Sequence, residues 1–418
     1  MKVTEIVKSF TIPTETLKTI SVNFAEEMRL GLHDHCGSLK MLPSFLDVPS
    51  GDEHGNYLAV DFGGSNVRVL LLKIADRKFE IVKRDVFSLR DGAKDFTAAN
   101  VQAADLFDYI VAKIKATIDS ETNYFLGHTF SFPCRQEGVK TSYLLNWTKE
   151  IKTAGVEGND VGRLLVDALV RGNVSNVDNN VILNDTVGTL LAAAMADETV
   201  DIGSICGTGH NTCYREMNYP TTGEPMIVNM ESGNFDRLEQ NYFDKLLDSK
   251  SGSPGTQMLE KMVSGHYLGM LAGLVLSEHF APHDIVISSA DISAVVADGA
   301  AAMRTILDAQ LPASAINDAM VADAAEIVVA IAVRSARLVG ATFAAVIQHS
   351  DPTISRKHTI AIDGSLYEKM PDYPGNILQA VLEIMPDAAN KVRTILSKDG
   401  SGVGAAMAAA AAAGIAGI

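Results

Sequence analysis

The segment DFGGSNVR, from Asp61 to Arg68, combines residue types that can hold phosphate groups. Because glycine has no Cβ, the backbone NH groups of Gly63, Gly64 and Ser65 can approach phosphate oxygens closely, and Arg68 can neutralise charge or brace the turn. Asp61, at a strand end, can hold a hydrated magnesium ion. An ordinary hairpin turn explains the same segment, so this motif alone is a weak signal.

A second glycine turn, Gly207-Thr208-Gly209, repeats this chemistry later in the chain. Both turns lie between short β-rich runs, which is the pattern of a β-hairpin and not of a glycine loop that opens a helix. Two such turns facing one another across a cleft would hold a polyphosphate from both sides. The pair therefore favours a nucleotide site more strongly than either turn alone.

Asn184 and Asp185 stand where a short apolar strand, residues 181–183, ends and a helix begins. A helix N-terminus favours the ionised form of a carboxylate, and an ionised carboxylate within reach of a hydroxyl can act as its general base. The alternative is that Asp185 only caps the helix. We interpret Asp185 as the candidate base.

Further polar residues near glycines or strand ends could surround a sugar. Each hydroxyl of a hexose needs hydrogen-bond partners when water is excluded, so several such side chains must converge. Taken singly, each is better explained as a surface group or a cap, and spacing alone does not group them. The candidates are Thr148, Lys149, Asn211, Glu231 and Glu260.

The elements expected to position these residues are strands and helices in mixed order. Strands are predicted at 58–61, 66–74, 129–133, 181–183, 203–206, 210–216 and 359–362. Helices are predicted at 14–31, 105–118, 161–170, 185–195, 256–279, 291–307, 321–348 and after 402. Thr14 is the expected N-cap of the first helix and Gly31 its expected end. Residues 400–418 carry no charge but are mostly alanine and glycine, which favours a buried helix over a membrane anchor.

Length and composition indicate a globular protein with two domains or lobes. The chain has 418 residues, of which 47% are hydrophobic and 21% charged. A formal charge of -16 argues against nucleic acid and anionic membranes as partners. The four cysteines form no CxxC pair, and the first residues lack the apolar stretch of a signal peptide, so a cytoplasmic location is expected.

Segments along nearly the whole chain resemble the hexokinase family. They are MLPSF (41–45), LAVDFGGSNVR (58–68), LGHTFSFP (126–133), LNWTK (145–149), NDTVG (184–188), GTGHN (207–211), EKMVSGHYLG (260–269), DGS (363–365) and DGSG (399–402). The resemblance implies an α/β protein with the actin-like ATPase (hexokinase) fold, two α/β lobes and a central cleft. It implies a small lobe of 49–186 plus about 402–418, and a large lobe of 1–48 plus 187–401.

The resemblance also implies an activity and a site. The activity is ATP-dependent phosphorylation of the 6-hydroxyl of glucose or another hexose, the first step of glycolysis, with Mg²⁺ and with Asp185 and Lys149 as catalytic residues. The implied sugar contacts are Ser131, Phe132, Pro133, Thr148, Lys149, Asn184, Asp185, Asn211, Glu231 and Glu260. The implied nucleotide contacts are Gly63, Gly64, Ser65, Asn66, Arg68, Thr208, Gly209, Gly364 and Ser365, with Asp61 holding the metal through water.

Three features depart from the usual family pattern. His128 stands where the family usually has an aromatic apolar residue, Ser232 where a tryptophan commonly follows the glutamate, and the connection at 234–241 is short. The two substitutions lie beside implied sugar ligands and so bear on sugar preference and affinity. Two other functions stay open, a catalytically weak sugar sensor and an actin-like filament protein. Sugar specificity, a donor other than ATP, regulation and the choice between monomer and homodimer also stay open.

Overall fold

The computed structural model describes residues 2–34, 36–63, 66–92, 94–147 and 151–415. The chain divides into two compact units. Unit 1 consists of Met1–Met41, Ser204–Thr212 and Met230–Leu396, and unit 2 of Leu42–Gly203, Cys213–Asn229 and Ser397–Ile418. The lobe boundaries implied by the family resemblance stay a prediction.

Unit 2 contains a five-stranded sheet in the order β10-β7-β2-β3-β4. Its strands are β2 (Gly55–Phe62), β3 (Asn66–Ala75), β4 (Lys78–Ser88), β7 (Tyr124–Phe130) and β10 (Val177–Leu183). Strands β2, β3 and β4 are antiparallel, whereas β7 is parallel to both β2 and β10. The predicted β2–β3 pair is confirmed, and its register places Asp61 opposite Arg68. Strand β4 was missed because its residues are mostly exposed and its apolar and charged residues do not alternate as in a half-buried strand.

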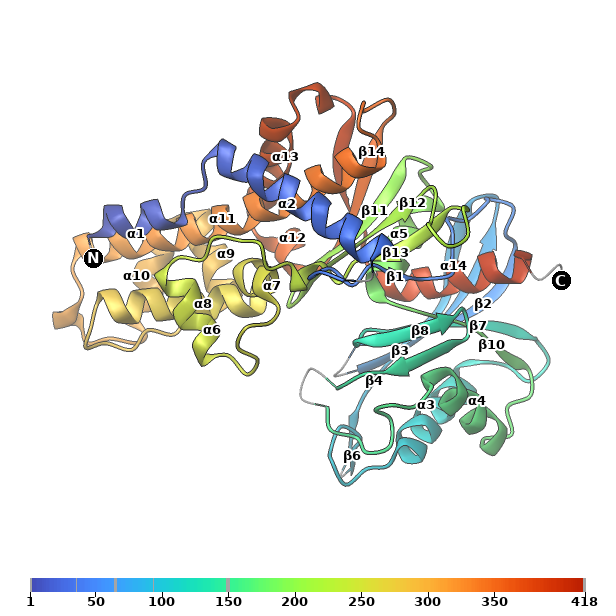
Figure 1. The fold of residues 1–418 in the computed structure, drawn as a ribbon. Coiled ribbons are helices and arrows are strands. Elements are labelled where there is room, and N and C mark those ends of the chain that lie inside the picture. Colours follow the sequence, from blue (N-terminus) through green and yellow to red (C-terminus); the bar gives the residue numbers. More distant parts are fainter. Residues whose placement is uncertain (1, 35, 64–65, 93, 148–150, 416–418) are drawn as a thin grey trace. The chain divides into compact units, whose positions relative to one another are not determined.

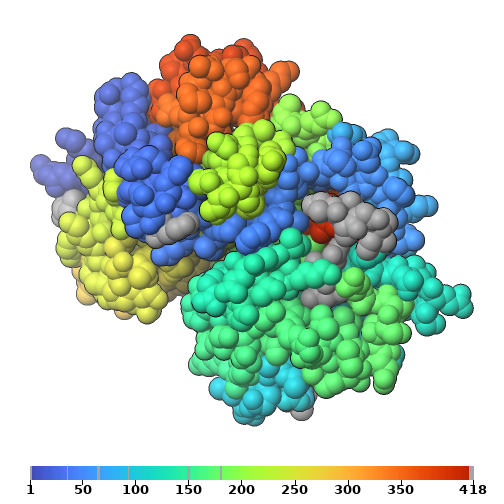
Figure 2. Space-filling view, turned by 45° about the vertical axis from the view of Figure 1, so that its right-hand side comes forward, coloured from blue at the N-terminus to red at the C-terminus, as the bar shows by residue number. Residues whose placement is uncertain are grey.

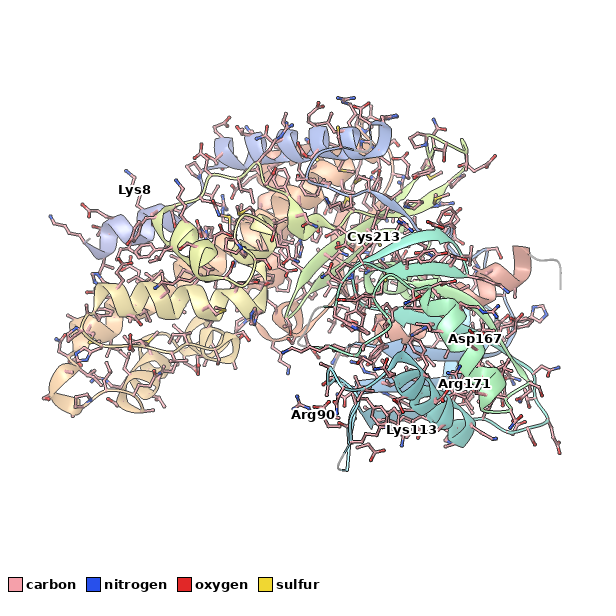
Figure 3. All side chains as sticks on the ribbon, turned by 60° about the horizontal axis from the view of Figure 1, so that its bottom comes forward. Lys8, Arg90, Lys113, Asp167, Arg171 and Cys213 are labelled. Atoms are coloured by element: carbon pink, nitrogen blue, oxygen red, sulfur yellow. The ribbon has the colours of Figure 1, made fainter. Side chains whose placement is uncertain are left out.

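Helices cover both faces of this sheet (Figure 1). Helices α3 (Ala103–Thr117) and α4 (Val161–Arg171) share a hydrophobic core with one face. Their charged residues, including Lys113, Asp167 and Arg171, form surface ion pairs (Figure 3). The C-terminal helix α14 (Gly400–Ile415) packs on the other face together with α5 (Asp185–Ala194). A Cβ at Gly127 of β7 would lie only 1.8 Å from the carbonyl oxygen of Ala405, so α14 lies directly on the strand and the predicted buried terminal helix is confirmed.

A second sheet has six strands in the order β1-β13-β12-β11-β14-β15. They are β1 (Leu42–Pro43), β13 (Met226–Asn229), β12 (His210–Glu216), β11 (Val200–Cys206), β14 (His358–Asp363) and β15 (Val392–Leu396). Strands β11 and β12 form the second predicted hairpin, which is confirmed, and the Gly207 NH donates to the Gly209 carbonyl at its turn (3.0 Å). Two small hairpins, β5 (Arg90–Asp91) with β6 (Lys94–Asp95) and β8 (Cys134–Gly138) with β9 (Thr141–Leu144), complete the strands.

Unit 1 is organised around the long helix α11 (Asp318–Ser350). Among the described residues it is the one helix long and apolar enough to cross a membrane, but 78% of its apolar stretch is buried inside the protein. It packs against α1 (Val3–Phe10), α2 (Thr14–His33) and α13 (Tyr373–Ile384), and α2 lies beside α13 on the surface (Figure 2). The remaining helices of the unit are α6 (Tyr242–Lys250), α7 (Met258–Val263), α8 (Gly265–His279), α9 (Ser289–Asp298), α10 (Ala300–Asp308) and α12 (Ser365–Lys369).

The predicted ends of the first long helix were wrong. Pro13 is the N-cap of α2, and the Thr14 hydroxyl instead donates to Glu383 Oε2 (2.7 Å). The helix also continues past Gly31 to His33. A Cβ at Gly31 would lie 2.4 Å from the Met41 side chain, so this glycine permits close packing and does not end the helix.

Two helices predicted as continuous are interrupted. The segment predicted at 256–279 forms α7 and α8, because Ser264 between them is extended (φ -81°, ψ 149°). The segment predicted at 291–307 forms α9 and α10, which meet at Gly299 with φ +56°. Apolar periodicity persists across both breaks, so the sequence pattern did not reveal them.

Candidate functional site

Asp185 is the first residue of α5 and directly follows β10. The N-cap is Asn184, whose Oδ1 accepts hydrogen bonds from the Thr186 NH (2.9 Å) and the Thr186 hydroxyl (2.7 Å). Asp185 Oδ1 also accepts from the Thr186 NH (2.9 Å). Since Asn184 caps the helix, capping does not explain Asp185. No lysine, arginine or histidine among the described residues forms an ion pair with its carboxylate.

Close glycine contacts fix the helix that carries Asp185. A Cβ at Gly203 would lie 2.6 Å from the Thr186 carbonyl oxygen, and a Cβ at Gly404 would lie 2.0 Å from that of Gly188. The backbone of α5 therefore packs directly against the backbone of β11 on one side and of α14 on another. Such contacts leave little freedom to shift, so the position of Asp185 is set by packing.

The segment Ser131 to Pro133 follows the end of β7. The Phe132 side chain is buried and its ring packs against those of Phe62 and Phe130, with centroid distances of 5.3 and 4.8 Å. Any contact between Phe132 and a sugar would therefore use the backbone. The NH of Ser131 donates to the Phe62 carbonyl (3.4 Å), which ties this segment to the end of β2.

Asp61 and Arg68 form an ion pair at the base of the first glycine turn. Arg68 Nη1 lies 2.9 Å from Asp61 Oδ2, and the Ser401 hydroxyl donates to the same oxygen (3.0 Å). Asp399 Oδ1 lies 3.8 Å from Arg68 Nη1, so two carboxylates balance the guanidinium. Arg68 therefore braces the turn, as one of the two predicted roles requires.

The described part of the turn is open to solvent. Gly63 and Asn66 are exposed, and a Cβ at Gly63 would meet nothing within 4 Å. The predicted site residues Gly64, Ser65, Thr148 and Lys149 lie outside the described residues.

The second glycine turn is held rigidly inside unit 1. The NH groups of Gly265 and His266, at the start of α8, donate to the carbonyls of Gly207 (2.8 Å) and Thr208 (3.1 Å). Gly364, with φ +124°, lies against the opposite side, where a Cβ would be 2.4 Å from the Cys206 carbonyl oxygen. A side chain at position 364 would therefore push the turn away.

Three predicted sugar ligands come together beside this turn. Glu260 Oε2 accepts a hydrogen bond from the His210 NH (3.1 Å), immediately after the turn. Asn211 Nδ2 lies 3.5 Å from Glu231 Oε1, at the limit of hydrogen-bond distance. Glu231 has φ +51°, an unusual backbone conformation for a residue other than glycine that is typical of functional sites. The structure thus brings two carboxylates and an amide together next to the second glycine turn.

A pocket of about 400 Å³ lies next to the same turn in unit 1. Of the predicted nucleotide residues, Thr208 and Ser365 line it, together with Gly207. Its lining includes no aspartate or glutamate, and Lys369 is the lone lysine or arginine in it. A pocket without carboxylates suits an anionic ligand, which matters in a chain of charge -16.

Sequence reasoning missed the other residues of this pocket. They come from α8, α12 and the start of α9 with the residues just before it, and they include His266, Met270, Ser288, Ser289, Ser293 and Lys369. The start of α9 was detectable, because Ser288 and Asp291 form a capping box. Nothing in the sequence linked that helix start to the glycine turn.

His128 and His210 are buried histidines with lowered pKa values. Burial lowers the pKa of each from 6.5 to about 4. His128 is fully buried in β7, and neither ring nitrogen has a hydrogen-bond partner among the described residues. The effect of His128 on sugar preference and affinity stays a prediction, whereas its burial bears directly on stability.

Comparisons with known proteins identify the family of this chain. Two family models, both described as hexokinase, match residues 2–195 and 201–411. Hexokinase-2 of Rattus norvegicus is 34% identical over 451 residues, which covers 98% of this chain and 48% of the relative. Hexokinase-1 of Schizosaccharomyces pombe is 32% identical, covering 97% of this chain and 90% of the relative. The chain therefore spans about half the length of the mammalian relatives it matches.

A solved hexokinase structure from Schistosoma mansoni, complexed with glucose, has a TM-score of 0.82 and 30% identity, covering 98% of both chains. The fold class expected from the sequence is confirmed. Together, the family models and the full-length matches establish that this chain belongs to the hexokinase family.

Proposed function

We propose that the chain transfers the terminal phosphoryl group of ATP to the 6-hydroxyl of glucose or another hexose, the first step of glycolysis. The observation that carries this proposal lies in unit 1. There, the hydrogen bond between Glu260 and the His210 NH joins a cluster suited to sugar hydroxyls to a glycine turn that borders an anion-compatible pocket. A sugar kinase needs these two sites adjacent, because the acceptor hydroxyl must meet the terminal phosphate.

Asp185 is the proposed general base. Its carboxylate takes the proton of the 6-hydroxyl as the hydroxyl oxygen attacks the γ-phosphorus and the bond to the β,γ-bridging oxygen breaks. The products are the sugar 6-phosphate and ADP, and the proton is released to solvent from Asp185. The close backbone packing of α5 supports this role, because a general base must be held within hydrogen-bond distance of the hydroxyl. Lys149 is the proposed partner that offsets charge on the transferring group.

The remaining sugar hydroxyls are assigned to the other polar residues of the predicted sugar set. Carboxylates accept from hydroxyls and amides both donate and accept, so Asn211, Glu231 and Glu260 can discriminate a sugar by its hydroxyl pattern. Ser131, Asn184 and Thr148 are proposed to complete the set, with Phe132 and Pro133 contributing backbone or apolar contact. This set is compatible with glucose, which the Schistosoma mansoni relative binds in its structure.

The nucleoside of the donor is proposed to occupy the unit 1 pocket. A volume of about 400 Å³ is within the usual range for small-molecule sites. Thr208, Gly209, Gly364 and Ser365 would contact the donor there. The first turn, through Gly63, Gly64, Ser65, Asn66 and Arg68, would contact its phosphates.

Mg²⁺ is proposed to bind with the donor phosphates, where it would neutralise charge. Asp61 is the proposed partner of the ion through water, and Arg68 balances the charge of its carboxylate. No cluster of three or more histidine, cysteine or acidic side chains able to hold a metal occurs among the described residues. A metal held mainly by the nucleotide needs no such cluster.

The test is a coupled assay for hexose 6-phosphate with glucose and MgATP. We expect activity in the natural protein and a loss of roughly 10²- to 10⁴-fold in kcat for Asp185→Asn, because removing a general base costs about that much. Asp160→Asn is the matched control, since Asp160 also stands at a helix N-terminus of unit 2 and its side chain caps α4. Near-normal turnover of Asp185→Asn would remove Asp185 from the role of base.

Two further measurements separate the alternatives. Glucose binding without formation of hexose 6-phosphate would support the sugar sensor. Light scattering that rises with ATP and does not change with glucose would support the filament protein. A panel of hexoses and nucleotides would then define specificity. We also propose a cytoplasmic enzyme, because all four cysteines are free thiols. The proposed oligomeric state is a monomer or a homodimer.

A further inference from the structure

Lys261 is a buried cation that the proposed reaction does not use. Its side chain is 2% exposed, on the short helix α7, and is next to Glu260 in sequence. Its Nζ donates to Asp248 Oδ1 (2.6 Å) and to the Ser253 carbonyl (2.6 Å). Burying an ammonium group is costly unless it is paired in this way, and an apolar side chain of similar size fills such a site at less cost.

The lysine closes a loop onto the preceding helix. Asp248 lies in the last turn of α6, and both of its carboxylate oxygens accept from the Gly255 NH (3.1 Å each). Asp248, Ser253 and Lys261 thus tie the segment 251–257 to α6 at one end and to α7 at the other. We name this set the Lys261 clamp.

Helix α7 needs such support to hold its orientation. It has 6 residues, and a helix this short is unstable in isolation. Two further hydrogen bonds hold α7, one from the Leu259 NH to the Phe235 carbonyl (3.1 Å) and one from the His210 NH to the Glu260 carboxylate (3.1 Å). Since Lys261 and Glu260 are consecutive on one helical turn, a rotation of α7 about its axis displaces the Glu260 carboxylate.

We propose that Lys261 is a positioning residue for hexose binding, which orients α7 so that Glu260 meets the sugar hydroxyls. This inference rests on the proposed function, because it requires Glu260 to be a sugar ligand. The glycine turn is held by the Gly265 and His266 NH groups, which belong to α8 and not to α7. We therefore expect the clamp to act on the sugar side more than on the nucleotide side.

The test compares Michaelis constants, which do not depend on the fraction of protein that is folded. We expect Lys261→Met to raise the KM for glucose roughly tenfold and the KM for ATP less than about threefold, since it misplaces a binding group without removing the base. Asp248→Asn keeps the shape of the clamp but weakens it, so a smaller rise in the same direction is expected. If Lys261→Met does not fold, Asp248→Asn carries the test.

Arg334→Met is the matched control. Arg334 forms another buried ion pair of unit 1, with Asp244, and both side chains are at most 2% exposed. It should lower stability without changing the ratio of the two KM values. An unchanged KM for glucose in the clamp variants, or an equal rise in both KM values, would overturn the proposal and leave Lys261 a stabilising residue only.

Glu260→Gln separates this inference from the proposed function. If Glu260→Gln raises the KM for glucose while the clamp variants do not, the positioning role alone is wrong. If Glu260→Gln leaves glucose binding unchanged, the assignment of Glu260 as a sugar ligand is wrong. The positioning role of the Lys261 clamp is then wrong as well.

Discussion

The substitution His128→Phe should make unit 2 less sensitive to acid. Burial lowers the pKa of His128 from 6.5 to about 4. Between these values the unfolded chain binds a proton that the folded chain excludes, so stability is complete above pH 6.5 and is lost as the pH falls toward 4. At ~1.4 kcal/mol per pKa unit, this loss reaches about 3 kcal/mol, and about 2 kcal/mol of it falls between pH 7 and pH 5.

Phenylalanine keeps a planar ring at this position but cannot be protonated. It also removes two buried ring nitrogens that have no partner among the described residues. Its larger ring can strain the core by ~1 to 3 kcal/mol, so the absolute stability at one pH is not diagnostic. The strain is the same at both pH values, so it cancels in the difference in unfolding free energy between pH 7 and pH 5. That difference therefore measures the contribution of proton binding alone.

Urea unfolding followed by the fluorescence of Trp147, the single tryptophan of the chain, measures this difference. Trp147 lies in unit 2, and its ring packs on Phe132 (centroid distance 4.9 Å), so it reports the unit that contains His128. We expect His128→Phe to lose about 2 kcal/mol less than the natural protein between the two pH values. His54→Phe is the control, because His54 is exposed. This variant should lose as much stability between pH 7 and pH 5 as the natural protein. An equal acid loss in His128→Phe would refute the burial argument.

Three further predictions concern packing, charge and the donor pocket. In thermal unfolding, Gly404→Ala should destabilise unit 2 by at least ~2 kcal/mol, because its Cβ would lie 2.0 Å from the backbone of α5. Gly402→Ala in the same helix should stay within ~1 kcal/mol, because the nearest atom to its Cβ, at 3.2 Å, belongs to the flexible side chain of Leu70. Arg334→Met should cost ~3 to 5 kcal/mol in denaturant unfolding, since it leaves the buried Asp244 carboxylate unpaired. Lys369→Met should raise the KM for ATP several-fold and leave the KM for glucose unchanged in steady-state kinetics, because it removes the lysine that lines the pocket.

The sequence by itself determined the local chemistry of this protein. Glycines at the two turns, the acid at the start of α5 and the alternation of the flanking strands are local signals, and the hairpins β2–β3 and β11–β12 follow from them. The family resemblance could be stated for the same reason, since its motifs are short and contiguous. Strand β4 and the breaks at Ser264 and Gly299 were missed, because exposure and tertiary packing decide them and not local periodicity.

Only the tertiary structure decided which distant residues meet. The sequence does not show that Glu260 reaches the His210 NH, or that His266, Ser289 and Lys369 share a pocket with the second glycine turn. These contacts join segments far apart in the chain, and they arise from how whole helices pack on the sheet. Burial is likewise a property of the packed core: the sequence places His128 beside implied sugar ligands, and only the structure shows that its side chain is fully buried. Spacing in a sequence fixes neighbours along the chain, whereas the packing of elements fixes neighbours in space.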